Sequence, residues 1–281
     1  MIEVSGKQFA CCDAVNRRGF LRAGFLGLTG LTLPQYQSDF SVQNLTLVQG
    51  LNLDRLDERR HLLRSFDGAR RIADAEGVAD SIDDFTRQAF EMVTGDQARK
   101  AFDLTGESAA TRDRYGRNTT GQSLLLSRRL IEAGVTFVTV RAGGWDDHSE
   151  IEKSMKQKGP AYDRGVSALV SDLYERGLDR QVLVIAMGEF GRTPRVNRNA
   201  GRDHWGNVMS VLLSGGGLRV GQVVGSSNSK GETPLDAPYR PEDVLMMAYR
   251  HLGIDCSATF NDFAGRPRHI LDRRRLISEL V

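Results

Sequence analysis

Two apolar runs of strand length place the strongest limit on what this chain can fold into. Residues 135–140 read Val-Thr-Phe-Val-Thr-Val and residues 182–186 read Val-Leu-Val-Ile-Ala, and glycine follows each run within a few residues. Continuous apolar runs of this length are typical of strands that are buried on both faces, as in parallel sheets. A helical pattern at 162–175 lies between them. The sequence therefore predicts a right-handed βαβ unit and an α/β fold class.

Further elements surround this unit. The pattern predicts a third strand at 208–213 and helices at 122–133 and 241–252. Upstream, apolar residues recur at helical spacing among charged ones and predict two or three amphipathic helices. These apolar residues are Leu53, Leu56, Leu62, Leu63, Phe66, Ile72, Ile82, Phe85, Ala89, Phe90 and Val93.

Composition excludes some classes of function. The chain has 281 residues, of which 40% are hydrophobic, so it can bury a sizeable core in one large domain or two small ones. Its formal net charge is only +2, which provides no long-range field for nucleic acid, and we expect no nucleic-acid partner. Cys11, Cys12 and Cys256 form neither a disulfide framework nor a zinc-binding spacing.

The amino-terminal segment resembles a twin-arginine (Tat) export signal. Arg17 and Arg18 precede a Phe-Leu pair and a short apolar stretch at 23–33. This stretch is far shorter than the ~20 residues that a spanning helix needs, so we expect residues 1–34 to be a targeting segment and not a stable membrane span. The alternative is the start of an ordinary amphipathic helix. The expected location is the periplasm or cell envelope, with residues 35–281 as the folded domain.

Carboxylates and imidazoles gather where the chain leaves the predicted strands. Asp146 and His148 follow the first run, and Glu189 follows the second. If the two strands are parallel neighbours, these side chains emerge at the same carboxyl-terminal edge, where open α/β sheets bind ligands. Asp203 and His204 supply further candidate ligands. A set of Asp, His and Glu suits zinc, manganese or iron.

Two arginines complete the predicted site. Arg192 and Arg202 offer forked donors for the oxygens of a phosphate or sulfate, while the metal would polarise the ester or lower the pKa of a bound water. Each motif also has a plain structural reading. The Asp-His motif can be a capped turn, Glu189 can cap a helix after a tight turn, and Arg202 can form a salt bridge with Asp203. The coincidence of three such motifs favours the metal site.

Several multi-residue motifs occur in an order that resembles a known family. They are, in chain order, the twin-arginine signal, Ala-Phe-Asp-Leu at 101–104, Arg-Tyr-Gly at 114–116, Arg-Arg-Leu-Ile-Glu-Ala-Gly-Val at 128–135, Gly-Trp-Asp-Asp-His at 144–148, Met-Gly-Glu-Phe-Gly-Arg-Thr-Pro at 187–194 and Gly-Arg-Asp-His-Trp at 201–205. From about residue 40 to residue 264 the chain resembles an uncharacterised, Tat-exported, sulfatase-like bacterial family, the domain of unknown function 1501. That family is similar to the alkaline phosphatase superfamily.

This resemblance implies a fold. We expect part of a three-layer α/β/α sandwich with a mostly parallel sheet, as in alkaline phosphatases and sulfatases. Within residues 35–281 we expect a helical portion at 50–133 and a βαβ-rich portion at 134–260. The first strand, the metal-binding aspartate and the nucleophile of the superfamily do not follow the signal here. The amino-terminal part of the catalytic domain is therefore expected to be missing, and no catalytic nucleophile is assigned.

The resemblance also implies roles for single residues. Asp146 and His148 look like the paired Asp and His ligands of the superfamily, and His204 looks like its last ligand. Glu189 stands where the superfamily has the Asp of an Asp-His pair, and Phe190 stands in place of that histidine.

Two functions remain open at this point. The first is a metal-dependent hydrolase of sulfate or phosphate esters, inactive if the missing segment supplies an essential ligand and the nucleophile. Its cofactor would be a divalent metal (zinc, manganese or calcium), and its substrate a small anionic ester or a sulfated or phosphorylated saccharide. The second is a non-catalytic exported envelope protein that uses the fold for binding or assembly. The sequence leaves the oligomeric state open.

Overall fold

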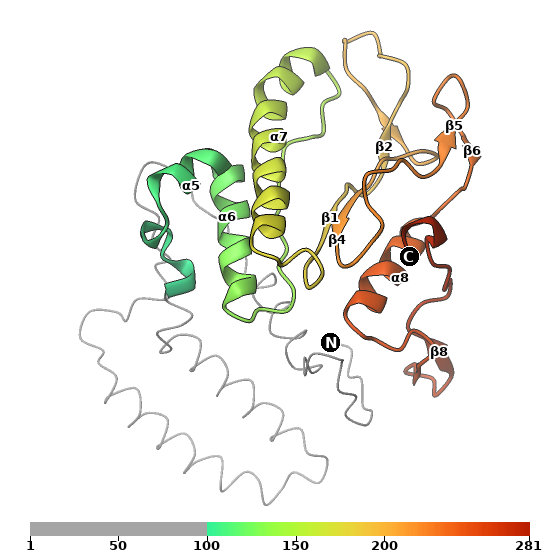
Figure 1. Cartoon of the computed structure of the whole chain (residues 1–281). Helices are drawn as coiled ribbons and strands as arrows, with labels where there is room; N and C mark the ends of the chain where they lie inside the picture. The colour runs from blue at the N-terminus through green and yellow to red at the C-terminus, as the bar shows by residue number, and fades with distance from the viewer. Residues whose placement is uncertain (1–99) are drawn as a thin grey trace, which may run out of the picture.

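The computed structural model describes residues 100–281, which form a helical layer beside a set of short strand pairs (Figure 1). The helical elements are the 3-10 turn η2 (Leu104–Gly106), α5 (Ala109–Tyr115), α6 (Thr119–Glu132), α7 (Ile151–Glu175), α8 (Pro241–His251) and the 3-10 turn η3 (Ser278–Leu280). The strands are β1 (Leu183–Ala186), β2 (Gly191–Arg192), β3 (His204–Trp205), β4 (Leu212–Gly215), β5 (Ser226–Ser227), β6 (Pro234–Asp236), β7 (Thr259–Asn261) and β8 (Pro267–His269).

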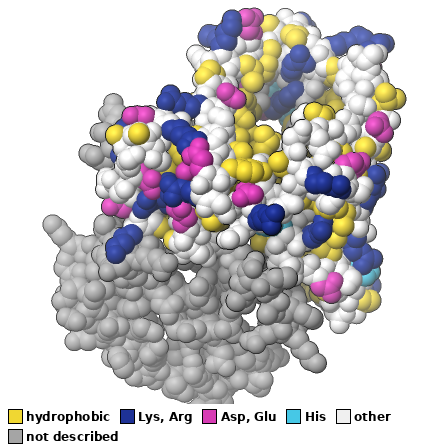
Figure 2. Space-filling model, in the orientation of Figure 1, with side chains coloured by type: hydrophobic (Ala, Val, Ile, Leu, Met, Phe, Trp, Pro, Cys, Tyr) yellow, Lys and Arg dark blue, Asp and Glu magenta, His cyan; other side chains and the backbone are white. Residues whose placement is uncertain are grey.

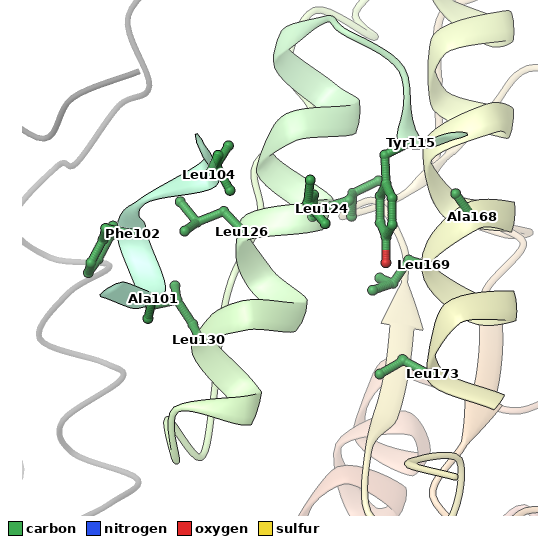
Figure 3. Packing of buried hydrophobic residues seen from close by; sticks show 11 residues of the cluster. Ala101, Phe102, Leu104, Tyr115, Leu124, Leu126, Leu130, Ala168, Leu169 and Leu173 are labelled. Atoms are coloured by element: carbon green, nitrogen blue, oxygen red, sulfur yellow. The ribbon is translucent and has the colours of Figure 1, made fainter. Parts of the chain in front are cut away.

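Helices α5, α6 and α7 pack around one apolar core (Figure 3). Ser108 and Asn118 begin α5 and α6, because the side-chain oxygen of each accepts a backbone N–H from the first turn of its helix. A Cβ atom on Gly165 of α7 would lie 2.9 Å from Leu124 Cδ1 of α6, so glycine lets these helices approach closely. The buried members of the core are Ala101, Phe102, Leu104, Tyr115, Leu124, Leu125, Leu126, Leu130, Ala168, Leu169 and Leu173.

A cluster of charged side chains is buried inside this helical layer. The Arg128 side chain is only 2% exposed, and its Nη1 lies 2.6 Å from Glu132 Oε2. Its Nη2 lies 2.8 Å from Glu107 Oε2 and its Nε lies 3.1 Å from Asp172 Oδ2. Tyr115, which is fully buried, donates its hydroxyl to Asp172 Oδ2 at 2.8 Å. Burial and this hydrogen bond raise the pKa of Tyr115. The cluster therefore ties all three helices together through paired charges.

The strands pair antiparallel, and the prediction of a mostly parallel sheet is wrong for the described residues. β1 pairs with β4, with Ile185 opposite Leu213. The other strands form separate antiparallel pairs, β2 with β3, β5 with β6 and β7 with β8. No helix lies between β1 and β4, and a parallel pair needs a long crossover that is usually helical. Residues 100–281 are thus mixed α/β with small sheets, not a parallel α/β/α sandwich.

The run at 135–140 forms no strand in the described part of the chain. Val135, Val138 and Val140 instead pack against the core of the helical layer. This packing partly buries the three valines without strand pairing, whereas Phe137 of the same run is 40% exposed. The predicted βαβ unit is therefore wrong, although helix α7 and strand β1 are both present.

Other elements agree better with the sequence. The helices predicted at 122–133 and 241–252 are confirmed as α6 and α8. Helix α7 begins at Ile151, well before the predicted start, and continues through Pro160. The third strand lies at Leu212–Gly215, slightly later than predicted. The predicted amphipathic helices within residues 53–93 and the signal at 1–34 lie outside the described residues.

A second apolar core lies between α8 and the carboxyl-terminal residues. Its buried members are Val244, Met247, Ile277 and Leu280. Asp243, which is fully buried, accepts from the backbone N–H of Arg240 at 2.8 Å and pairs with Arg273 Nε at 2.7 Å. The first contact caps α8 and the second holds the carboxyl-terminal segment against it.

The described surface carries charges of both signs. Figure 2 shows acidic and basic side chains interspersed on the face in view. Among the helices of residues 100–281, none combines the length and hydrophobicity that a membrane crossing requires.

Candidate functional site

Two loops lie side by side and carry most of the predicted ligands. Residues 146–150 lead into α7, and residues 193–203 connect β2 to β3. An isolated antiparallel bridge joins Ser149 to Ala200, and the backbone N–H of Arg202 donates to the carbonyl of Asp147 at 3.0 Å. These backbone contacts bring together residues that are about fifty positions apart in the chain.

One carboxylate oxygen is the centre of the site. Asp146 Oδ1 lies 3.0 Å from His148 Nε2 and 2.9 Å from His204 Nε2. Arg192 Nη1 lies 2.7 Å from the same oxygen. Arg192 and His204 stand opposite each other in the β2–β3 pair, which explains why both side chains reach Asp146. The two imidazole rings are 4.9 Å apart between centroids.

The second nitrogen of His148 faces another carboxylate. Nδ1 lies 2.8 Å from Asp203 Oδ1. The hydrogen bond from His148, and to a smaller extent the one from Asn197, lowers the pKa of Asp203. The carboxylate is therefore ionised and can only accept, so His148 Nδ1 carries the proton. The lone pair of a neutral His148 is then left on Nε2, which faces Asp146.

The site is electrostatically coupled although its groups are exposed. The hydrogen bond with His204 and the neighbouring guanidinium of Arg192 lower the pKa of Asp146 to about 2. The hydrogen bond with Asp203, together with the nearby charge of Asp146, raises the pKa of His148. Asp146 is therefore anionic at neutral pH, and the nitrogens around it are held by its negative charge.

The arrangement fits a divalent metal. His148 Nε2 faces Asp146 Oδ1 at 3.0 Å, a distance that either a hydrogen bond from a protonated imidazole or a cation bound by both groups would satisfy. Ligand atoms of tetrahedral zinc are roughly 3.3 Å apart, because Zn–N and Zn–O distances are about 2.0–2.1 Å. Ligand atoms of Asp146, His148 and His204 all lie within 4.8 Å of one another. A carboxylate behind a ligating histidine, as Asp203 lies behind His148, is common at metal sites.

Three of the predicted site residues lie differently. Asp203, which the sequence suggested as a metal ligand, is not a member of the group formed by Asp146, His148 and His204 and instead contacts His148 Nδ1. Glu189 is exposed and makes no ion pair with any described residue, and it is not a member of the group formed by Asp146, His148 and His204. Arg202 Nη1 donates to the carbonyls of Thr193 and Pro194, at 2.5 and 2.7 Å. These hydrogen bonds stabilise the conformation of the 193–203 loop. A metal role for Glu189 and an anion role for Arg202 stay predictions.

The guanidinium of Arg192 lies beside the cluster. Its Nη1 is buried and ion-paired with Asp146, yet it has no hydrogen bond of good geometry within residues 100–281. Buried polar groups without a hydrogen bond are rare and call for an explanation. The carboxylate of Asp146, 2.7 Å away, neutralises the charge of this buried nitrogen.

Sequence reasoning missed or misplaced several residues around the site. The centroids of the Phe190 and His204 rings are 4.4 Å apart, so Phe190 packs on a histidine of the site. Lys158 Nζ binds Asp147 Oδ1 at 2.7 Å and anchors the loop to α7. Asn197 contacts both His148 and Asp203. The Asn-Arg-Asn-Ala-Gly run at 197–201 predicts a turn, but no local signal shows what that turn contacts.

Gly201 provides a test of how tightly the two loops are joined. A Cβ atom there would lie 2.0 Å from the His148 carbonyl carbon, whereas a Cβ on Gly206 would meet no atom within 4 Å. We expect Gly201→Ala to lower the free energy of unfolding by roughly 1–3 kcal/mol, because backbone must move to relieve the overlap. Urea denaturation measures the effect. Gly206→Ala is the matched control, and equal stability of the two variants would contradict the close packing of the loops.

Comparisons with known proteins support one part of the sequence interpretation. A family model described as "Protein of unknown function (DUF1501)" matches residues 10–281. The family that the motifs predicted is therefore confirmed. No curated protein and no solved structure matches the chain significantly.

Proposed function

The chain belongs to the DUF1501 family, and from the geometry of its site we propose that it is a sulfatase-like, metal-dependent hydrolase of sulfate or phosphate esters. One observation carries this proposal. Asp146, His148 and His204 converge with ligand atoms within 4.8 Å of one another, although they come from separate loops and strands. The proposal places the metal on these three side chains.

The donor set narrows the choice of metal. Two imidazoles and one carboxylate suit zinc or manganese better than calcium, which prefers oxygen ligands only. When bound, such a cation would supply Lewis acidity and lower the pKa of a bound water. Three protein ligands leave a coordination position for water or substrate, which is typical of catalytic zinc sites.

The remaining residues of the site have supporting roles in this proposal. Asp203 keeps the proton on His148 Nδ1 and thereby directs the Nε2 lone pair toward Asp146. Arg192, whose guanidinium adjoins Asp146, donates to the non-bridging oxygens of a sulfate or phosphate. The side chains of His148 and Asp146 are 47% and 63% exposed, so a small anionic ester or the sulfated or phosphorylated end of a saccharide could reach them.

The relationship to the alkaline phosphatase superfamily and export by the Tat route belong to the same proposal. Both rest on the order of the motifs, with Arg17 and Arg18 before the apolar stretch and the Asp146, Glu189 and His204 motifs after it. Periplasmic or envelope location is tested by fractionating cells that express the full chain. Unchanged export after both arginines are replaced by lysine would contradict the Tat route.

Metal binding and hydrolysis test the proposed activity directly. We expect the purified full chain to bind zinc or manganese and to unfold at a higher temperature when either is added, since a ligand that binds only the folded state stabilises it. Aryl sulfates and aryl phosphates are the substrates to assay with the metal-loaded protein. Binding without hydrolysis would leave the non-catalytic envelope protein as the better description. Protein without metal, and without any thermal shift, would exclude the metal site.

A further inference from the structure

We infer that Asn197 is the positioning residue of this site, an inference that rests on the proposed metal centre. Asn197 lies in the 193–203 loop and contacts the 146–150 loop through the carbonyl of His148. It is not a candidate ligand itself. Its contacts hold the backbone of one ligand and the carboxylate that orients that ligand.

The side chain of Asn197 uses its full hydrogen-bonding capacity. Nδ2 donates to the His148 carbonyl and to Asp203 Oδ1, each at 3.1 Å. Oδ1 accepts the backbone N–H groups of Asn199 and Gly201, each at 2.9 Å. A primary amide offers two donor hydrogens and one oxygen with two lone pairs, and all four are engaged here.

These contacts allow only one orientation of the amide. If the amide were turned over, its NH2 group would face two N–H donors and its oxygen would face two acceptors. The orientation is therefore set by the turn, through Asn199 and Gly201. The backbone turn thereby also determines where the two hydrogens of Asn197 Nδ2 point.

Asn197 affects His148 in two ways, through the Asp203 carboxylate and through the His148 carbonyl. Asp203 Oδ1 accepts hydrogen bonds from Asn197 Nδ2 at 3.1 Å and from His148 Nδ1 at 2.8 Å. Asn197 therefore holds the Asp203 carboxylate in position, and this carboxylate orients the His148 ring. The same amide also holds the carbonyl of His148. Ring tautomer and backbone position are thus controlled by one side chain, and both are needed to aim Nε2 at Asp146.

Neither aspartate nor alanine reproduces the four hydrogen bonds of the amide. Aspartate keeps the acceptor for Asn199 and Gly201 but presents an anionic oxygen to Asp203 and to the His148 carbonyl. Alanine loses all four hydrogen bonds. Asn199 offers a matched control in the same turn, because it is exposed and only its backbone N–H takes part in the contacts described.

The test compares Asn197→Ala and Asn197→Asp with Asn199→Ala in the full chain. Isothermal titration with Zn²⁺ measures the dissociation constant. Loss of a group that orients a metal ligand typically weakens binding about 10–100-fold, and we expect a loss of that size for both Asn197 variants. The added charge of Asn197→Asp would by itself attract the cation more strongly, so weaker binding by this variant identifies lost positioning.

A second readout needs no metal. Long-range ¹H–¹⁵N NMR spectra of the zinc-free protein report which nitrogen of neutral His148 carries the proton. We expect the Nδ1–H form in the wild type and in Asn199→Ala, and a smaller share of that form in both Asn197 variants. Circular dichroism establishes that each variant is folded, and the aspartate variant, which preserves the turn, serves if the alanine variant does not fold.

The outcomes separate this inference from the proposed metal site. Zinc affinity and tautomer that match Asn199→Ala in a folded Asn197 variant would overturn the role of Asn197. If the wild type binds no zinc, the metal proposal fails, and the tautomer alone decides whether Asn197 positions His148.

Discussion

The Asp146→Asn variant is expected to lose zinc affinity by more than about a hundredfold, and with it any hydrolysis of aryl sulfates or phosphates. Asp146 Oδ1 contacts both imidazoles, at 2.9 Å from His204 Nε2 and 3.0 Å from His148 Nε2. Changes to groups that only orient a ligand cost about 10–100-fold, so removal of the carboxylate that is proposed to bind the metal should cost more. The neutral amide also leaves the cationic Arg192 beside the metal without its counter-charge.

Isothermal titration with Zn²⁺ and the thermal shift on zinc addition measure this loss. Asp163→Asn is the matched control, because Asp163 is an exposed aspartate on α7 and is not a member of the candidate metal group. Asp163→Asn should bind zinc as the wild type does. Zinc binding that survives in Asp146→Asn would move the metal away from Asp146 and would contradict the proposed centre.

Replacement of Arg128 by methionine should strongly destabilise the helical layer. Arg128 is 2% exposed and lies against Glu107 and Asp172, whose side chains are 10% and 8% exposed. Removing one partner from a buried ion pair typically costs about 3–5 kcal/mol, because the remaining charge stays buried. We expect about 3 kcal/mol, since Arg129 still pairs with Glu107 and Arg176 still pairs with Asp172.

The same cluster should make this loss depend on pH. Burial alone would raise the pKa of Glu107 and of Asp172. The guanidiniums of Arg128 and Arg129 outweigh it at Glu107, and Arg176 and Tyr115 outweigh it at Asp172, so both pKa values are lowered. The unfolded chain then binds more protons than the native state in acid. The stabilisation is present above the unfolded values of about 4 and is lost as pH falls through the lowered ones.

Urea denaturation at several pH values measures both effects. The difference between wild type and Arg128→Met should be largest near neutral pH and should shrink below about pH 4, where the carboxylates become protonated. Arg180→Met is the control, because Arg180 is exposed. Equal stability of the two variants, or a difference that grows in acid, would contradict the buried cluster as described.

Local patterns predicted the elements whose boundaries are set by nearby residues. Helices α6 and α8 and strand β1 lie close to their predicted positions, because capping residues and apolar spacing act within a few positions. Local patterns do not show whether two strands pair parallel or antiparallel, and the prediction of a parallel sheet was wrong for this reason. An apolar run such as 135–140 indicates at least partial burial, but it does not indicate the backbone conformation, and here the partly buried valines lie outside any strand or helix.

The candidate site shows the same division. Motif order identified the family, and it selected Asp146, His148 and His204, which the fold brings together. It also selected Glu189 and Arg202, whose contacts differ from those expected. Residue types indicate which side chains can bind a metal, whereas the backbone decides which of them meet.

The amino-acid sequence by itself thus determined the family, the helices and the residue types of the site. Only the tertiary structure decided the antiparallel pairing, the convergence on Asp146 and the placement of Asn197. The physical reason is the sequence separation over which each kind of interaction acts. Caps and amphipathic spacing act over a turn or two of chain, while the hydrogen bond between His148 and Asp203 joins residues 55 positions apart. Such contacts depend on how two loops are packed, and no local pattern of residues specifies that packing.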